Sequence, residues 1–79
     1  MSKTAPEQNP IRGLVAANLK RLRRAAGYSQ EGLAVAAGFH RTYVSQIERG
    51  RINVTVDGIW RLAVLLRVDV MEFFSPLED

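Results

Sequence analysis

The sequence predicts an all-α fold of five helices. Apolar residues recur at helical spacing along most of the chain, and residues that favour helix ends flank these segments. No segment alternates apolar and polar residues in the manner of a β-strand, since the candidate at residues 54–56 is too short. The 79 residues are enough for one small domain. We place this domain at residues 11–74, between an N-terminal arm at 1–10 and a short acidic tail at 75–79.

The first helix is expected to begin at residue 11. Its apolar positions share one face and are Ile11, Leu14, Val15, Leu19, Leu22 and Ala26. Gly27 follows directly and is a residue typical of helix C-termini. Lys20, Arg21 and Arg24 lie on the other faces, where exposed charges need no functional explanation.

The next two helices are short and adjoin one another. Ser29 is a favourable N-cap for the second helix, and Gly38 ends it. The third helix is expected from near His40 to Gly50. A connection of about three residues that contains glycine is typical of a helix-turn-helix, in which the two helices cross steeply. The apolar residues expected to fix this crossing are Leu33, Phe39, Val44 and Ile47.

The last two helices are predicted from capping residues and apolar spacing. Thr55 is placed to cap the fourth helix. Its apolar positions repeat at i, i+3, i+4 and i+7 and are Ile59, Leu62, Ala63 and Leu66. Asp69 and Glu72 have the spacing of a capping box ahead of two phenylalanines, which predicts a short fifth helix.

Polar side chains share one face of the expected third helix. At 100° per residue one arc holds Arg41, Thr42, Ser45, Gln46 and Arg49. Tyr43, Val44 and Ile47 occupy the opposite arc. Arginine can donate two hydrogen bonds to guanine, glutamine can pair with adenine, and threonine can contact the thymine methyl group. The pattern predicts a surface that contacts bases in a DNA major groove; the alternative is a merely solvated helix face.

Charge is distributed unevenly along the chain, whose net charge is +3. Residues 12–51 carry eight basic and two acidic side chains, which gives +6, whereas residues 52–79 carry −3. A basic region beside an acidic one favours a polyanionic partner on one side of the molecule.

The segment SQEGLAVAAGFHRTYVSQIERG at residues 29–50 resembles the Cro/CI-type (Xre) family of helix-turn-helix regulators. The resemblance extends over residues 11–74. The short chain and its HRTYVSQIERG segment are most similar to the controller proteins of restriction–modification systems. The resemblance implies a five-helix domain that binds inverted-repeat operators in double-stranded DNA as a symmetric homodimer.

The resemblance also implies roles for individual residues. The residues that we expect to contact bases are Arg41, Thr42 and Gln46, with Ser45 beside them. Backbone contacts are implied for Gln30 and Arg49, and to these we add Ser29, Tyr43 and Arg51.

Two further positions match the family and two depart from it. Arg23 and Glu48 match an ion pair that links the first and third helices. Gly32 stands where the family often has a glutamate, so Ser29 lacks the partner of a capping box. His40 replaces the serine, aspartate or asparagine that is common at the third N-cap.

Trp60 and Val64 lie beside the apolar arc of the fourth helix rather than within it. A helix that is apolar on nearly two faces must cover the second one. One interpretation is packing under the N-terminal arm. We favour a homodimer interface, because two recognition helices are needed to contact half-sites one turn apart. The residues expected in this interface are Trp60, Val64, Val68, Val70, Met71, and Phe73 or Phe74.

Composition argues against other classes of protein. The chain has no cysteine and one histidine, and no nucleophile–base pair, phosphate-binding loop or metal-ligand set is evident. We expect no enzymatic activity, cofactor, metal or small-molecule substrate. Residues 1–10 lack the apolar core of a signal peptide, and the longest apolar run, residues 62–66, is too short to span a bilayer. We therefore expect a soluble, cytoplasmic protein.

The function predicted from the sequence is a sequence-specific DNA-binding transcriptional regulator of the controller type, acting as a homodimer. A phage-type repressor and the DNA-binding antitoxin of a toxin–antitoxin pair are alternatives within DNA binding. In a different class, a protein-interaction module could use the same fold without DNA.

Overall fold

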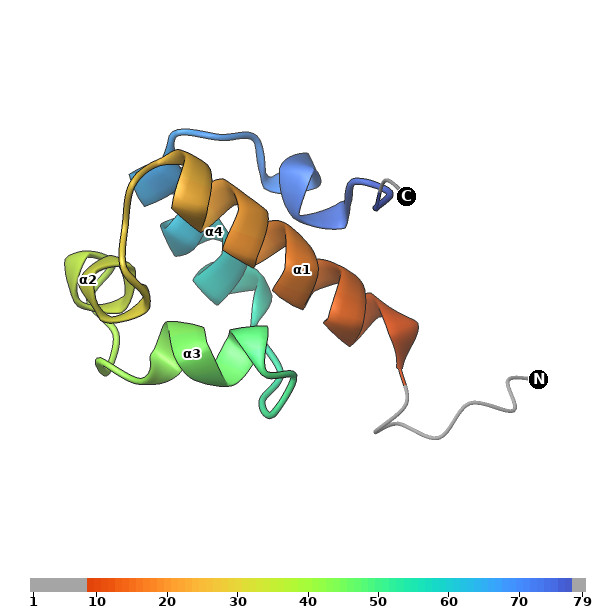
Figure 1. The fold of residues 1–79 in the computed structure, drawn as a ribbon, viewed down its shortest axis with the longest axis horizontal. Helices are drawn as coiled ribbons and strands as arrows, with labels where there is room; N and C mark the ends of the chain where they lie inside the picture. The colour runs from red at the N-terminus through yellow and green to blue at the C-terminus, as the bar shows by residue number, and fades with distance from the viewer. Residues whose placement is uncertain (1–8, 78–79) are drawn as a thin grey trace.

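The computed structural model describes residues 9–77. Its elements are α1 (Pro10–Ala25), α2 (Gln30–Ala36), α3 (Tyr43–Glu48), α4 (Val56–Leu66) and the 3₁₀ helix η2 (Val70–Phe74) (Figure 1). Over the described residues the prediction of an all-helical chain is confirmed. The predicted fifth helix is present only as a 3₁₀ turn, so this range holds four α-helices and not five. Residues 1–8 of the expected arm lie outside the described residues.

Local chemistry determines both ends of α1. The Oδ1 atom of Asn9 accepts a hydrogen bond from the backbone N–H of Ile11 at 2.9 Å, and Pro10 occupies a position whose N–H would have no partner. At the other end Gly27 has a φ of +83°, and the N–H of Tyr28 donates to the carbonyl of Arg23 at 3.1 Å. This motif directs the chain from α1 toward α2.

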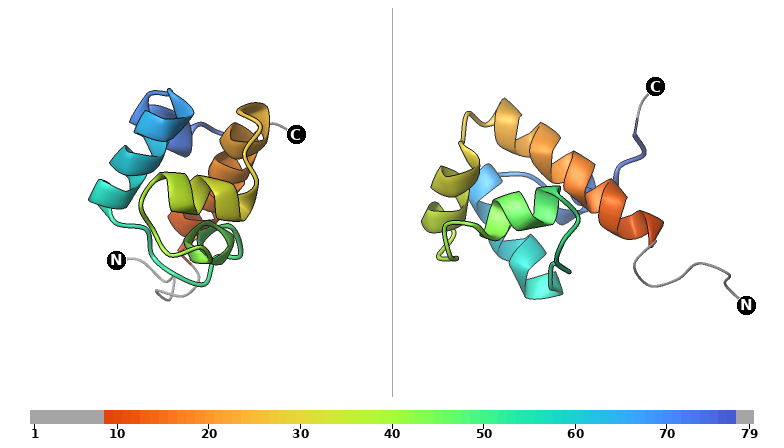
Figure 2. Two further views of the ribbon diagram at one scale, coloured as in Figure 1. Left: turned by 90° about the vertical axis from the view of Figure 1, so that its left-hand side faces the viewer. Right: turned by 60° about the horizontal axis from the view of Figure 1, so that its bottom comes forward.

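The helices α2 and α3 cross steeply, as predicted for a helix-turn-helix. In Figure 1, α2 is seen end-on while α3 runs across the view, and the left view of Figure 2 reverses this. The helix α3 is shorter than predicted, because Arg41 and Thr42 form a turn and the helix begins at Tyr43. The N–H of Thr42 donates to the ring of His40 at 3.2 Å, and this contact replaces a helical hydrogen bond.

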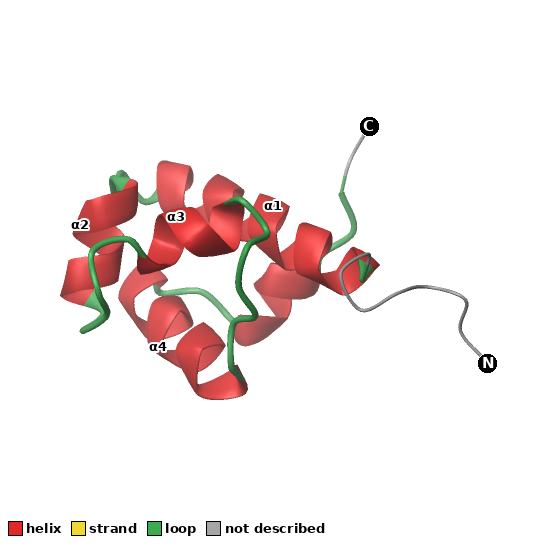
Figure 3. Ribbon diagram, turned by 90° about the horizontal axis from the view of Figure 1, so that it is seen from below, coloured by secondary structure: helices red, strands yellow, loops and turns green. Residues whose placement is uncertain are grey.

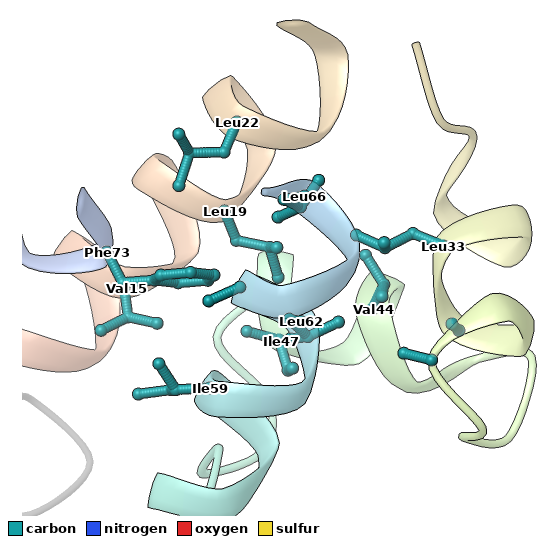
Figure 4. Packing of buried hydrophobic residues seen from close by; sticks show 13 residues of the cluster. Val15, Leu19, Leu22, Leu33, Val44, Ile47, Ile59, Leu62, Leu66 and Phe73 are labelled. Atoms are coloured by element: carbon teal, nitrogen blue, oxygen red, sulfur yellow. The ribbon is translucent and has the colours of Figure 1, made fainter. Parts of the chain in front are cut away.

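Every element contributes to one hydrophobic core. The largest fully buried apolar side chains, one from each element, are Leu19, Leu33, Val44, Leu62 and Phe73 (Figure 4). Truncation of such a residue to alanine typically costs about 2–5 kcal/mol. A helix as short as α3 is not stable in isolation, so this core holds it in place.

A buried polar contact attaches η2 to α1. The side-chain nitrogen of Asn18 donates to the carbonyls of Phe73 at 3.0 Å and Ser75 at 2.9 Å. The amide oxygen of Asn18 accepts from Arg21. Asn18 thus satisfies carbonyls that a longer helix would pair internally, and Pro76 has no N–H with which to continue an α-helix. The chain therefore forms a single 3₁₀ segment there.

None of the helices within residues 9–77 combines the length and the apolar character needed to cross a membrane.

Candidate nucleic-acid interface

Backbone hydrogen bonds close the turn between α2 and α3. The N–H of Gly38 donates to the carbonyl of Val35 at 3.0 Å, and the N–H of Phe39 donates to the carbonyl of Ala34 at 2.9 Å. Gly38 has a φ of +83°, a conformation that residues with a Cβ rarely adopt. A Cβ at this position would also collide with the guanidinium of Arg61. The turn therefore requires glycine, and any other residue here would also displace the Arg61 side chain.

Arg61 of α4 braces this turn. Its Nη2 atom donates to the carbonyl of Ala37 at 2.7 Å, and its guanidinium carbon lies 4.3 Å from the centre of the Phe39 ring. The Phe39 ring stacks on Tyr43, with the ring centres 4.1 Å apart. The sequence did not reveal this role, because one arginine on the polar side of an amphipathic helix gives no indication of the turn that it contacts.

Tyr43 lies on the side of α3 that faces α4. It is half-buried, and its hydroxyl lies beside Thr55 and the backbone of Gly58. Burial raises the pKa of Tyr43 above its usual value of 10.0, although Thr55 and the positive charge of Arg61 act in the opposite direction. The structure therefore separates Tyr43 from the outer polar face of α3.

The expected ion pair between Arg23 and Glu48 is present and buried. The Nε and Nη2 atoms of Arg23 lie 2.7 Å and 3.1 Å from the two carboxylate oxygens of Glu48. The Nη1 atom of Arg23 donates to the carbonyl of Tyr28 at 2.9 Å. Gln30 donates from its side-chain nitrogen to Glu48 at 2.9 Å. Through this contact the amide nitrogen of Gln30, a residue predicted to contact the DNA backbone, links α2 to α3.

The outer face of α3 is open. Seen from below, α3 lies in front of α1, and no other helix covers it (Figure 3). Arg41, Thr42 and Arg49 are exposed, whereas Ser45 and Gln46 are half-buried. Within the described part of the chain, the side chains of Arg41, Gln46 and Arg49 make no hydrogen bond or ion pair. Of the predicted base-contacting residues, Arg41 and Thr42 thus lie in the turn before α3 and Ser45 and Gln46 on the helix itself, all with part of their surface open to solvent.

The hydroxyl groups on this face are hydrogen-bonded within the protein. The Thr42 hydroxyl oxygen lies 2.9 Å from Nδ1 of His40, the nitrogen that also accepts from the backbone N–H of Thr42. The Ser45 hydroxyl donates to the carbonyl of Thr42 at 2.9 Å. The expectation that His40 occupies the N-cap of the third helix is wrong, because the helix begins later and its N-cap is Thr42, which makes no side-chain capping bond. The His40 ring instead accepts from the backbone of the turn that precedes α3.

The remaining residues that we assigned to the DNA backbone flank α3. Ser29 is exposed, and its hydroxyl oxygen accepts from the N–H of Gly32 at 2.9 Å, so the cap forms without a glutamate at position 32. Arg51 is exposed directly after α3, and its N–H donates to the carbonyl of Gln46 at 3.0 Å.

The expected dimer residues divide into exposed and buried members. Trp60 and Val64 of α4 are 61% and 53% exposed, and Met71 and Phe74 of η2 are 66% and 38% exposed. Val70 is also exposed, and Val68 is half-buried. Phe73 is 0% exposed and belongs to the core of its own chain, so its assignment to a dimer interface is wrong. Of the two phenylalanines, only Phe74 is available to a partner.

The exposed apolar surface is larger than the sequence indicated. Val56 is also exposed and, by its spacing from Trp60 and Val64, lies on the same side of α4. A cleft of about 290 Å³ between Val56, Phe74 and Ile11 continues this surface toward the start of α1. The sequence could not connect these residues, because they come from three separate elements.

The described residues contain no cluster of three or more histidine, aspartate or glutamate side chains that could hold a metal ion.

Comparison with known proteins gives consistent matches. A family model described as a helix-turn-helix domain matches residues 14–73. An uncharacterized HTH-type transcriptional regulator of Sinorhizobium fredii is 41% identical, and the match covers 87% of this chain and 90% of that protein. The crystal structure of a hypothetical transcription factor from Neisseria has a TM-score of 0.81 at 36% identity, covering 96% of this chain and 86% of the other. The restriction–modification controller protein C.AhdI from Aeromonas hydrophila has a TM-score of 0.77 at 38% identity, covering 82% and 94%.

Proposed function

Because this chain belongs to the helix-turn-helix family of transcriptional regulators, we propose that it binds inverted-repeat operators sequence-specifically as a homodimer. The family is a class of DNA-binding proteins and not of enzymes. The similarity to C.AhdI supports the narrower proposal that it regulates restriction–modification genes.

The outer face of α3 is the observation that carries the proposal. Arg41 and Thr42 are exposed just before the helix and Gln46 is partly exposed on it. Behind them, Arg23 of α1 and Gln30 of α2 bond to Glu48 of α3, and Phe39 stacks on Tyr43. A single α-helix fits the major groove, and these side chains have the donors and acceptors that distinguish base pairs there. Rigid support matters, because the side chains must meet base edges in one register.

The flanking residues suit contacts that position the protein on DNA. Arg49 and Arg51 are exposed cations at the end of α3, and Ser29 is exposed at the start of α2. Contacts with phosphates fix register and orientation, whereas contacts with bases determine sequence preference. The two sets of residues therefore have separable effects on binding.

The apolar surface on α4 and η2 supports the homodimer. One recognition helix contacts only a few base pairs, and a two-fold dimer presents two of them to half-sites about one helical turn apart. Trp60, Val64 and Met71 give this surface large apolar side chains that a monomer would leave in water.

Selection of bound fragments from a random pool of double-stranded DNA tests the proposal. We expect an inverted repeat, with half-sites separated by about 10 base pairs from centre to centre. In the selected sequence, Arg41→Ala should weaken binding by about 1–3 kcal/mol and relax the preference at one base pair per half-site. Arg49→Ala is the matched control, because it should weaken binding to all sequences and reduce the salt dependence.

Two outcomes would contradict the proposal. A pool that shows no enriched sequence at moderate salt would favour a protein-interaction module over a DNA-binding regulator. An enriched sequence without two-fold symmetry would retain DNA binding but exclude the symmetric homodimer on its operator.

A further inference from the structure

The hydrogen bonds between His40 and Thr42 determine which atom carries the ring proton of His40. The backbone N–H of Thr42 can only donate, and it donates to Nδ1 of His40 at 3.2 Å. This nitrogen must therefore carry a lone pair, which leaves the proton of the neutral ring on Nε2. The Thr42 hydroxyl oxygen lies 2.9 Å from the same Nδ1 atom. Because Nδ1 has no hydrogen to donate, the hydroxyl must be the donor in this second contact, and the two donors share the one lone pair of Nδ1.

This assignment fixes what Thr42 can offer to a ligand. The hydroxyl hydrogen is directed at His40, so the oxygen presents only lone pairs to the outside. Ser45 is in the same state, because its hydroxyl donates to the carbonyl of Thr42 at 2.9 Å. Two neighbouring hydroxyl groups on α3, each of which could in principle donate or accept, are thus both set as acceptors.

An acceptor discriminates between bases in the major groove. Adenine and cytosine present amino groups there, which donate, whereas guanine and the oxygen of thymine accept. A hydroxyl set as an acceptor pairs with an amino group at no cost to its bond within the protein. To pair with a carbonyl oxygen it must first give up that bond.

We propose that His40 is a specificity-determining residue that sets Thr42 to accept a hydrogen bond from the amino group of adenine or cytosine. The proposal rests on the DNA-binding function proposed above and adds the class of base recognised. His40 acts through Thr42 and is a positioning residue. Arg41, which can only donate, complements this preference because it suits guanine.

A double-mutant cycle between protein and DNA tests the proposal. Each adenine or cytosine of the selected operator is replaced singly by an analogue that lacks only the amino group. We expect one position per half-site at which the analogue weakens binding of the unsubstituted protein about fivefold. Thr42→Val should weaken binding to the natural operator by a similar factor and be insensitive to the analogue. Thr42→Ser, which keeps the hydroxyl, is the control and should retain the sensitivity.

Two substitutions of His40 separate positioning from folding. His40→Asn supplies a side-chain oxygen that can accept from the same groups, and should preserve the fivefold sensitivity at the Thr42 position. His40→Ala removes the acceptor and should reduce that sensitivity to within twofold, with unchanged affinity for unrelated DNA. If His40→Ala instead weakened binding to all DNA equally, or left the sensitivity intact, the role of His40 would be overturned.

The proposal and the underlying function fail in different ways. If the random pool yields no preferred sequence, the DNA-binding function itself fails. If a sequence is selected but the base coupled to Thr42 is guanine or thymine, only the assignment to His40 fails. Nitrogen NMR of the free protein provides a test without DNA, because a proton found on Nδ1 of His40 would contradict the proposal directly.

Discussion

Glu48 is the residue on which the buried polar contacts of this domain converge. Its carboxylate pairs with Arg23 and also accepts from Gln30, so it joins three helices. The side chains of Arg23 and Glu48 are only 9% and 4% exposed. Removal of one partner from such a pair leaves an uncompensated charge in a region of low dielectric constant.

We expect Glu48→Ala to lower the free energy of unfolding by about 3–5 kcal/mol. Urea denaturation followed by circular dichroism measures this change. The double substitution Arg23→Met with Glu48→Leu is the control. It should be much less destabilising than Glu48→Ala, because no charge is left buried. Equal losses for the single and double variants would show that packing, and not the buried charge, determines the effect.

Tyr43 makes the stability of the fold depend on alkaline pH. Burial raises its pKa in the folded chain, whereas in the unfolded chain it titrates near its usual value of 10.0. Its contribution is fully present below that unfolded value and is lost as the pH rises through the higher folded pKa. When the pH is raised above 10, we expect the free energy of unfolding to fall less in Tyr43→Phe than in the unsubstituted protein. The shift of the urea midpoint with pH measures this loss in each protein.

At the scale of single residues, the sequence predicts contacts that follow a family pattern and misses those that depend on a local conformation. Arg23 and Glu48 could be paired from the resemblance. The contact of His40 with Thr42 could not, because it requires the turn that delays the start of α3 to Tyr43. The sequence did not indicate the structural role of Asn18, because the partners of its side chain are backbone carbonyls more than fifty residues away in the chain.

The turn between α2 and α3 depends on a third element, α4. Arg61 binds the carbonyl of Ala37 and lies over the ring of Phe39, which in turn stacks on Tyr43 of α3. The angle between the two helices of the motif is thus set partly by a side chain outside the motif. This bracing links the helix that carries Trp60 to the helix that is proposed to enter DNA.

We expect Arg61→Met to weaken binding to the selected operator more than binding to unrelated DNA. The variant keeps aliphatic packing but loses the hydrogen bond and the cation–π contact, each worth about 1 kcal/mol. Arg61→Lys keeps the charge and should recover part of the affinity. The measurement is the ratio of dissociation constants for operator and unrelated DNA, at fixed salt. An unchanged ratio in Arg61→Met would mean that Arg61 does not set the position of α3.

The element that the sequence predicted least well is η2. The capping residue was identified correctly, since Asp69 accepts from the N–H of Met71 at 2.8 Å. The type of helix was not predicted correctly. Whether residues 70–74 form an α-helix or a 3₁₀ helix depends on Asn18 and Pro76 as well as on these residues themselves. In the 3₁₀ segment that forms, Phe73 faces the core and Phe74 is exposed.

At the scale of the molecule, polar and apolar faces lie on different elements. The polar face on α3 and the apolar surface on α4 and η2 can engage DNA and a second protomer without competing for the same residues. The sequence predicted this division from charge and apolar spacing. It could not supply the extent of the apolar surface, which joins Ile11, Val56 and Phe74 from separate elements.

We expect the unsubstituted protein to be dimeric and Trp60→Glu to be monomeric at the same concentration. A charge in the centre of an apolar interface typically costs more than 2 kcal/mol, and operator affinity should fall roughly 30-fold or more as a result. Analytical ultracentrifugation and binding assays measure the two effects. Val35→Glu is the control, because Val35 is equally exposed but lies on α2. If both variants dimerise normally, the interface lies elsewhere.

The six-residue length of α3 limits how its specificity could be transferred. A peptide that copies residues 40–51 would lack the core, the brace from α4 and the ion pair to α1, and so few turns of helix do not persist alone in water. Grafting the recognition surface onto another scaffold would therefore require that the supporting residues Arg23, Phe39 and Arg61 be transferred as well. The portable unit is the arrangement of four helices, and not the segment that faces the ligand.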